Sequence, residues 1–224
     1  MRDGGRATRT AAGLAALACL TAPLAAQSRL RPLVEASAAS LLVRSEVGPT
    51  TMTLKGTVVG GEGHLELGRI GLILGYAQGT LSPAGGGGGG GGAASQDVVE
   101  GKVLIAVRPA PWLTLQGGPQ ARAYVTAGGT QRWLLWRVQA RAEPELVPDR
   151  VRSFVALFQI VSADINVVEQ FDRGRGGEVG VLARLGHSAL WARLGYGIEQ
   201  IRLGGGARLE TVDRVAVSVA VGRP

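Results

Sequence analysis

The feature that most constrains the fold of this chain is a two-residue alternation of polar and apolar side chains. Successive side chains of a β-strand point to opposite faces of a sheet. Between Trp112 and Tyr124, one set of alternate residues is mostly polar or charged: Trp112, Thr114, Gln116, Gly118, Gln120, Arg122 and Tyr124. The residues between them are apolar or small: Leu113, Leu115, Gly117, Pro119, Ala121 and Ala123. This segment therefore predicts a strand with one polar and one apolar face.

The alternation recurs along the chain. It is regular in segments 102–108, 132–143, 178–185 and 190–199, and the last segment places Val215, Val217, Val219 and Val221 on one face. Three other segments are less regular. Residues 64–77 change phase near Gly68 and Arg69, which predicts a β-bulge there; residues 152–161 are apolar on both faces; residues 33–44 could be partly helical.

The breaks between these segments predict the order of the connections. Short breaks are expected at 61–63, 109–111, 145–149 and 186–188, and longer ones at 45–50, 80–96, 127–130, 164–176 and 204–207. The two kinds alternate, which is typical of outer-membrane barrels with short turns on one side and long loops on the other. Ten strands result, or eight if the weakly patterned residues 33–59 form none. Pro119 predicts a kink, because proline cannot donate to a central strand ladder.

The N-terminal segment predicts export. Arg2, Arg6 and Arg9 precede an apolar stretch at 11–24, and Ala25-Ala26-Gln27 follows. This order predicts a signal peptide over 1–26 and a mature domain over 27–224, with a membrane anchor as the alternative. A helical span needs about 20 apolar residues, and no later segment approaches that length. Cys19 is the single cysteine, so we expect it to be removed with the signal peptide unless it is lipidated, and the mature chain to contain no disulfide.

The charge balance is basic, with 24 Lys and Arg against 17 Asp and Glu. A nucleic-acid partner would account for such a balance, but it would call for a basic run or a binding motif. Here the charges are spread over the alternating segments. We therefore expect no nucleic-acid partner.

Over residues 33–222 the chain resembles small bacterial outer-membrane β-barrel proteins, through its export signal, its alternation and the order of its breaks. The resemblance implies an all-β fold: an up-and-down antiparallel transmembrane β-barrel of about ten strands. It also implies an outer-membrane location, contact with outer-membrane lipid and insertion by the barrel-assembly machinery. Proteins of this kind serve as structural proteins, narrow channels, adhesins or lipid-active enzymes, and the resemblance points to no particular ligand.

Catalytic and metal-binding patterns are weak. His187 and Ser188 are adjacent, but neighbouring strand residues face opposite sides and this pair falls in a predicted turn. The acidic residues Asp164, Glu169 and Asp172 share one loop without the spacing of a calcium loop. The eight glycines of 85–92 predict a flexible part of loop 80–96, because a phosphate-binding loop would continue with Lys and Ser or Thr. We expect no enzymatic activity, no metal site and no cofactor.

The polar strand faces supply the candidate site. In a barrel of eight to ten strands the lumen is narrow and side chains fill it, so the inward charges should form a network. The prediction is a structural or binding role. Alternatives are a narrow channel for anions or small solutes, since basic residues predominate, a lipid-A or peptide hydrolase, and a soluble periplasmic barrel with its apolar faces inward. The predicted network consists of Lys102, Arg108, Arg122, Arg137, Arg141, Glu143, Glu178, Arg184, Arg193 and Glu199.

Overall fold

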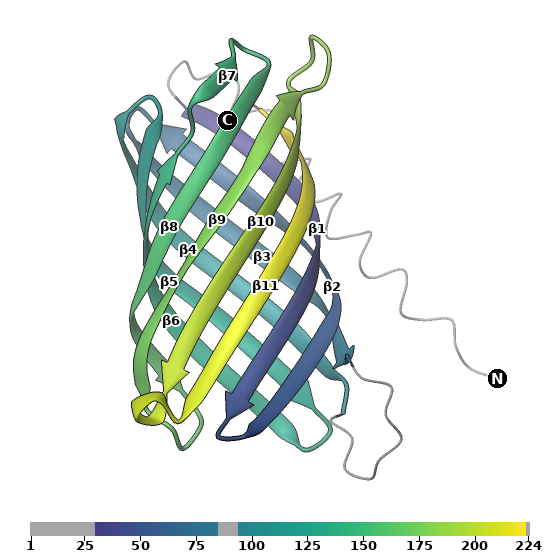
Figure 1. Ribbon diagram of the computed structural model, residues 1–224. Helices are drawn as coiled ribbons and strands as arrows, with labels where there is room; N and C mark the ends of the chain where they lie inside the picture. Colours follow the sequence, from purple (N-terminus) through teal and green to yellow (C-terminus); the bar gives the residue numbers. More distant parts are fainter. Residues whose placement is uncertain (1–29, 85–93, 223–224) are drawn as a thin grey trace, which may run out of the picture.

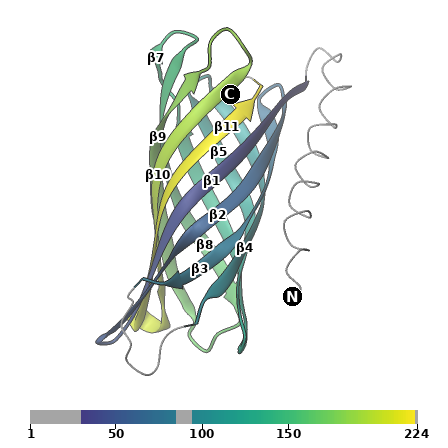
Figure 2. The same ribbon diagram turned by 90° about the vertical axis from the view of Figure 1, so that its right-hand side faces the viewer.

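The computed structural model describes residues 30–84 and 94–222, which form one closed antiparallel barrel (Figures 1 and 2). Each long strand pairs with the one before it, and β1 pairs with β11 to close the wall, where the purple and yellow strands meet in Figure 1. The strands are β1 (Leu30–Val47), β2 (Thr50–Leu67), β3 (Ile70–Pro83), β4 (Gln96–Ala110), β5 (Leu113–Thr126), β6 (Gly129–Ala142), β7 (Glu145–Val147), β8 (Val151–Ile165), β9 (Phe171–Arg184), β10 (Leu190–Leu203) and β11 (Arg208–Val221).

The predicted all-β, up-and-down barrel is confirmed. Ten long strands form the wall, while the short β7 pairs with the start of β8 inside the connection from β6. Residues 33–44 belong to strand β1, so the helical alternative for them is wrong. The described part of the chain contains no helix long and apolar enough to cross a membrane. The predicted signal peptide, Cys19 and the glycine run lie outside the described residues.

One predicted break lies in the wrong place. Residues 61–63 lie inside β2, and the chain turns instead at Gly68 and Arg69, where a bulge was predicted. Leu67 pairs directly with Ile70 across this two-residue turn, and Gly68 has a φ of 64°. Only glycine adopts that conformation without cost, so Gly68 is the residue that the hairpin requires.

The expected alternation of short turns and long loops is also wrong. We call the end of the barrel that holds residues 30 and 221 the terminal end, and the opposite end the loop end. At the loop end, β1–β2 and β5–β6 are joined by two residues each, whereas at the terminal end the β6–β8 connection spans 143–150. The predicted loops were too long because strand pairing continues into them. Ser45–Val47, expected in a loop, belong to β1 and pair with both β11 and β2.

The outer surface carries an apolar band in the half of the barrel near the terminal end. On β3 it runs from Ile70 to Tyr76, and on β10 from Leu190 to Ile198, with the side chains that face outward exposed or half-buried. At about 3.3 Å per residue and a strand tilt of about 40°, such stretches cover about 15–20 Å along the barrel axis, most of the roughly 25 Å apolar band of membrane barrels. Tyr76, Trp136 and Tyr196 are exposed near its border toward the loop end.

Beyond this border the barrel reverses its polarity. Outward side chains toward the loop end include Thr80 and Ser82 on β3 and Arg202 on β10. The lumen at the same level is apolar, and its buried residues are Ala39, Leu41, Val43, Leu54, Val58, Leu81, Val98, Tyr124, Trp133, Leu135, Ile160, Ile201, Leu203 and Val212. A soluble barrel would need this arrangement along its whole length, whereas the terminal half exposes its apolar faces.

Glycines on β9 create room for the large side chains of β8. A Cβ atom on Gly176 would lie 2.2 Å from Cζ of Phe158, and one on Gly180 would lie 2.6 Å from the ring of Phe154. Each ring therefore occupies the space that a side chain on the neighbouring strand would fill. These contacts explain why residues 152–161 are apolar on both faces: Phe154 and Phe158 fill the lumen, while Val155 and Leu157 face outward.

Where Pro119 predicted a kink, the pairing of β5 with β4 is interrupted, and the register is the same on both sides of the interruption. Val103 and Leu104 of β4 have no register partner on β5, in the stretch that faces Gly118 and Pro119. Gly118 has a φ of 155°, and a Cβ atom there would lie 2.2 Å from the carbonyl oxygen of Val103. The strand thus brings its backbone close to β4 at a position that only glycine fits.

This close approach predicts different effects for two adjacent substitutions. Gly118→Ala should lower the free energy of unfolding by about 2–4 kcal/mol, because the added methyl group meets backbone that cannot move away without breaking the ladder. Gly117→Ala should change it by less than about 1 kcal/mol, since its Cβ atom would lie 3.6 Å from the nearest heavy atom, the Arg137 carbonyl oxygen. Urea unfolding followed by tryptophan fluorescence compares the two. Equal losses would contradict the assignment of Gly118.

Candidate functional site in the barrel interior

Four charged side chains bridge the lumen near the middle of the barrel. Arg122 of β5 is 4% exposed and donates to Glu100 of β4 at 2.6 Å and to Glu199 of β10 at 2.7 Å. Glu100 also accepts a hydrogen bond of 2.6 Å from Arg214 of β11. Because β4 and β5 stand across the barrel from β10 and β11, this central quartet joins opposite walls. Its two positive and two negative charges balance.

The balance matters because a buried charge is costly unless it is paired and hydrogen-bonded. Arg122 bonds two carboxylates through separate nitrogens, Nε and Nη1. Glu100 uses both of its oxygens, one for each arginine. The central quartet therefore satisfies its own charges with side chains from four strands.

A second group of charges lies nearer the terminal end. Arg193 of β10 lies 3.3 Å from a carboxylate oxygen of Glu35 on β1 and 2.6 Å from one of Glu178 on β9. On the opposite side, Lys102 forms an ion pair with Glu62, and a second oxygen of Glu62 lies 2.6 Å from Nε2 of His64. These pairs extend the network down the lumen.

Aromatic rings support the arginines of β6. Arg137 donates to Gln139 at 2.5 Å, and its guanidinium carbon lies 3.5 Å from the ring centroid of Phe158. Arg141 forms an ion pair with Glu143 and lies 4.1 Å from the ring centroid of Phe154. Guanidinium groups are attracted to aromatic faces, most strongly where water is excluded. The rings of β8 thus help to position Arg137, which bonds to glutamine side chains, and Arg141, which is paired with a carboxylate.

Nine of the ten predicted site residues face the lumen and contact another interior side chain. Among these, Arg108 forms an ion pair of 2.7 Å with Glu66. Arg184 differs because it lies at the last position of β9. Its Nε donates to the carbonyl oxygen of Ser188 at 2.7 Å, so it holds the turn at the terminal end instead of joining the network.

Sequence reasoning missed most of the acidic residues of the network and two of its arginines. The alternating segment predicted at 102–108 begins too late in the chain. Glu100 lies two residues before Lys102 on the same strand and faces the same side. The excess of basic residues that suggested an anion path disappears once the omitted carboxylates are included. The additional ion-paired interior residues are Glu35, Glu62, Glu66, Glu100, Arg208, Glu210 and Arg214.

An apolar layer fills the lumen on the loop-end side of the central quartet. We call it the apolar plug, made of the buried cluster given above, and it draws side chains from nine of the ten wall strands. Trp133 and Leu135 of β6 are each 1% exposed, and Tyr124 meets Trp133 edge to face with ring centroids 6.5 Å apart. Side chains packed in this way exclude water from the centre of the barrel.

The residues considered for catalysis do not assemble a reactive group. His187 and Ser188 lie in the exposed turn between β9 and β10, as predicted. The Ser188 hydroxyl donates to the Leu185 carbonyl oxygen at 2.6 Å and accepts from the Leu190 amide at 3.2 Å. Asp172 accepts a hydrogen bond from the Gly206 amide. Within residues 30–84 and 94–222, no three His, Cys, Asp or Glu side chains are arranged to hold a metal ion.

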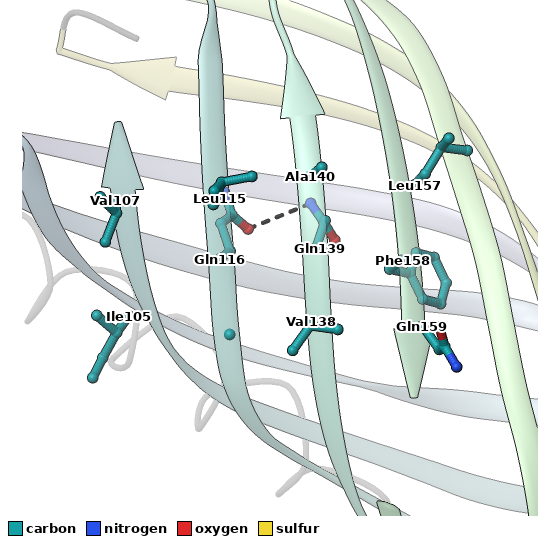
Figure 3. Close-up of a pocket in the computed structure, with 11 residues that line it drawn as sticks. Ile105, Val107, Leu115, Gln116, Val138, Gln139, Ala140, Leu157, Phe158 and Gln159 are labelled. Atoms are coloured by element: carbon teal, nitrogen blue, oxygen red, sulfur yellow. Dashed lines mark hydrogen bonds between the residues drawn. The ribbon is translucent and has the colours of Figure 1, made fainter. Parts of the chain in front are cut away.

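A surface hollow lies across β4, β5, β6 and β8 (Figure 3). It has a volume of about 740 Å³, and its outward walls include Ile105, Val107 and Val138. At its base, Gln139 donates to Gln116 at 3.4 Å (Figure 3). The lining contains no titratable side chain and lies within the apolar band, so its chemistry suits hydrocarbon and provides no general acid or base.

The sequence matches no protein-family model and none of the curated proteins with which it was compared. Among solved structures, the outer membrane protease OmpT from Escherichia coli is similar, with a TM-score of 0.56 and 7% identity over 88% of this chain and 97% of that chain. The translocator domain of the autotransporter NalP from Neisseria meningitidis gives a TM-score of 0.46 and 13% identity over 94% and 96%. An outer membrane channel from Pseudomonas putida F1 gives 0.48 and 9% over 88% and 97%.

At 7% identity, the similarity to OmpT shows a shared fold and leaves activity open. The closed ten-strand barrel, with its apolar outer band, agrees with what the sequence resemblance implied. The chain has the fold of small bacterial outer-membrane β-barrel proteins.

Proposed function

We propose that this protein is an outer-membrane barrel with a closed interior and a structural or binding role, without enzymatic activity. It reaches the membrane through the signal peptide predicted at 1–26 and the barrel-assembly machinery. Support for the location comes from the outward apolar band and its aromatic border residues, Tyr76, Trp136 and Tyr196.

The observation that carries the proposal is the presence of two closures in series along the lumen. An ion that crosses the barrel would have to separate the bonds of Arg122 to Glu100 and Glu199. It would then have to enter the apolar plug, where a dehydrated ion is costly. The central quartet and the apolar plug together close the lumen to ions. Neither of them needs a bound ligand to do so.

One feature favours the narrow channel as a second candidate. The lumen on the terminal side of the quartet retains a cavity of about 130 Å³, lined by charged residues that include Arg31, Glu66 and Arg108. Small polar solutes could enter this part. Passage through the barrel would still require the apolar plug to open.

Conductance separates the two candidates. The folded mature chain, reconstituted in a planar bilayer, should give no steady current at either polarity. Its insertion is verified in the same preparation by the shift in gel mobility on heating, and its location by its presence in the outer-membrane fraction. A stable conductance with anion preference would establish the channel instead, and recovery in the soluble periplasmic fraction would refute the membrane location.

The quartet makes a separate prediction for stability. Arg122→Met should lower the free energy of unfolding by about 3–5 kcal/mol, because it leaves two buried carboxylates without their shared partner. Adding Glu199→Gln to this variant should recover part of the loss, because it removes the carboxylate that is left without a partner, while Glu100 keeps its bond to Arg214. Urea unfolding in detergent micelles measures both.

Arg184→Met provides the matched control, because the same chemical change is made on an arginine at the edge of the lumen. It should cost less than about 1 kcal/mol. A loss for Arg122→Met no larger than that of the control would show that the quartet is not the main contributor. A double variant Arg122→Met/Glu199→Gln that is less stable than Arg122→Met would refute the charge-pairing explanation.

A further inference from the structure

Three arginines stand together on the outer surface of the barrel. Arg173 and Arg175 belong to β9 and Arg202 to β10, and all three are exposed. Their outward direction follows from their neighbours: Gly174 lies against Ile160 in the lumen, and Arg202 stands between two fully buried lumen residues. We call these three residues the arginine cluster.

The strand register brings their charges within reach of one small anion. Arg202 is directly opposite Arg173, and Gln200 is directly opposite Arg175. Directly opposite Cβ atoms lie about 4.5–5.5 Å apart. Two residues along one face of a strand lie about 6–7 Å apart. Three long guanidinium side chains starting from these positions can converge on a single phosphate.

The cluster has no protein counterion among the described residues. No carboxylate lies within ion-pair distance of Arg173, Arg175 or Arg202. Asp172, the next residue in sequence, accepts the Gly206 amide at 2.8 Å, and Asp213 on β11 bonds Arg44 and Tyr196. This differs from the lumen, where most arginines have a carboxylate partner. Like charges placed directly opposite each other on a sheet are destabilising, so an external anion would relieve this arrangement.

The position of the arginine cluster along the barrel axis indicates which class of anion it meets. On β9 the outward residues Val181 and Val179 are apolar, and Arg175 follows after Gly177. On β10 the apolar stretch ends at Ile198, followed by Gln200 and Arg202. The cluster therefore starts where the apolar band stops, at the depth where a bilayer places its headgroup phosphates.

We propose that the arginine cluster binds the phosphate of an anionic lipid headgroup in the leaflet next to the loop end. Guanidinium groups bind phosphate oxygens through paired, charge-assisted hydrogen bonds. Gln200 and Gln159, which flank Arg175 on the adjacent strands, offer further donors. The proposal rests on the membrane placement of the proposed function, and it adds a ligand class and a site.

The test uses the full mature barrel in nanodiscs of phosphatidylcholine, with or without a minor fraction of phosphatidic acid, whose headgroup is a phosphate monoester. After partial delipidation, mass spectrometry counts the phosphatidic acid that remains on each barrel. Wild type should retain it about ten-fold more than the variant R173Q/R175Q/R202Q, as expected for the loss of charge-assisted bonds. The variant K55Q/R132Q/R150Q is the matched control: it removes three scattered basic charges and should retain the lipid like wild type.

The unfolding temperature provides a second measurement. If the arginine cluster had only a structural role, phosphatidic acid would not reverse the order of stability between wild type and variant. In phosphatidylcholine alone, R173Q/R175Q/R202Q should unfold at a higher temperature than wild type, because opposed like charges are removed. With phosphatidic acid the order should reverse, because the lipid stabilises only the barrel that binds it. Inorganic phosphate, added to phosphatidylcholine nanodiscs, should not reproduce the reversal.

Each of the following results would contradict one part of the proposal. Equal lipid loss from the cluster variant and the control would show general charge attraction and overturn the site. Retention by all three proteins would overturn it as well. Stabilisation by inorganic phosphate alone would replace the lipid with a free anion. Failure of wild type to enter the nanodisc would overturn the proposed membrane function together with this inference, whereas a conductance result leaves the inference unaffected.

Discussion

The structure depends on pairing the charges that its narrow lumen encloses. A barrel of ten strands leaves room for side chains and little else, so a charged residue inside it cannot keep a full hydration shell. Arg122 meets this constraint with two carboxylates from opposite walls, and Arg193 does so with Glu35 and Glu178. The wall, the outer band and the apolar plug are arranged around these pairs.

The reversal of polarity along the barrel axis gives the two halves different tasks. In the terminal half, hydrocarbon-like residues face outward, and ion pairs share the lumen with two small apolar clusters. In the loop-end half, residues such as Leu81 and Leu203 are fully buried in the lumen, while threonine, serine and arginine face outward. The second arrangement is that of a water-soluble barrel. The strands therefore extend a rigid, closed platform beyond the apolar band.

The fold was predictable because strand alternation reports directly on which face is buried. The alternation between Trp112 and Tyr124 placed Arg122 in the lumen and Leu115 on the outside, as observed, although Trp112 itself lies in the turn before β5. The turn at Gly68 was not predictable in the same way, since the nearby glycines of β2 give similar turn signals and only register separates them. Half of the interior network was also missed. Glu100 has no distinguishing local pattern, and its role depends on Arg214, which is 114 residues away in the chain.

That separation in sequence has a consequence for folding. The ion pairs that cross the lumen join residues far apart in the chain, such as Arg122 with Glu199 and Arg193 with Glu35. While the sheet is still open, these side chains can remain hydrated, and nothing favours their burial. Arg122 can pair with Glu100, and Arg193 with Glu178, on neighbouring strands before closure. The bonds across the lumen form only when β1 meets β11, so full neutralisation of the charges and the closing of the wall occur as one step. A chain arrested before this step would expose a polar, hydrated sheet face, and the network would favour complete barrels over partial ones.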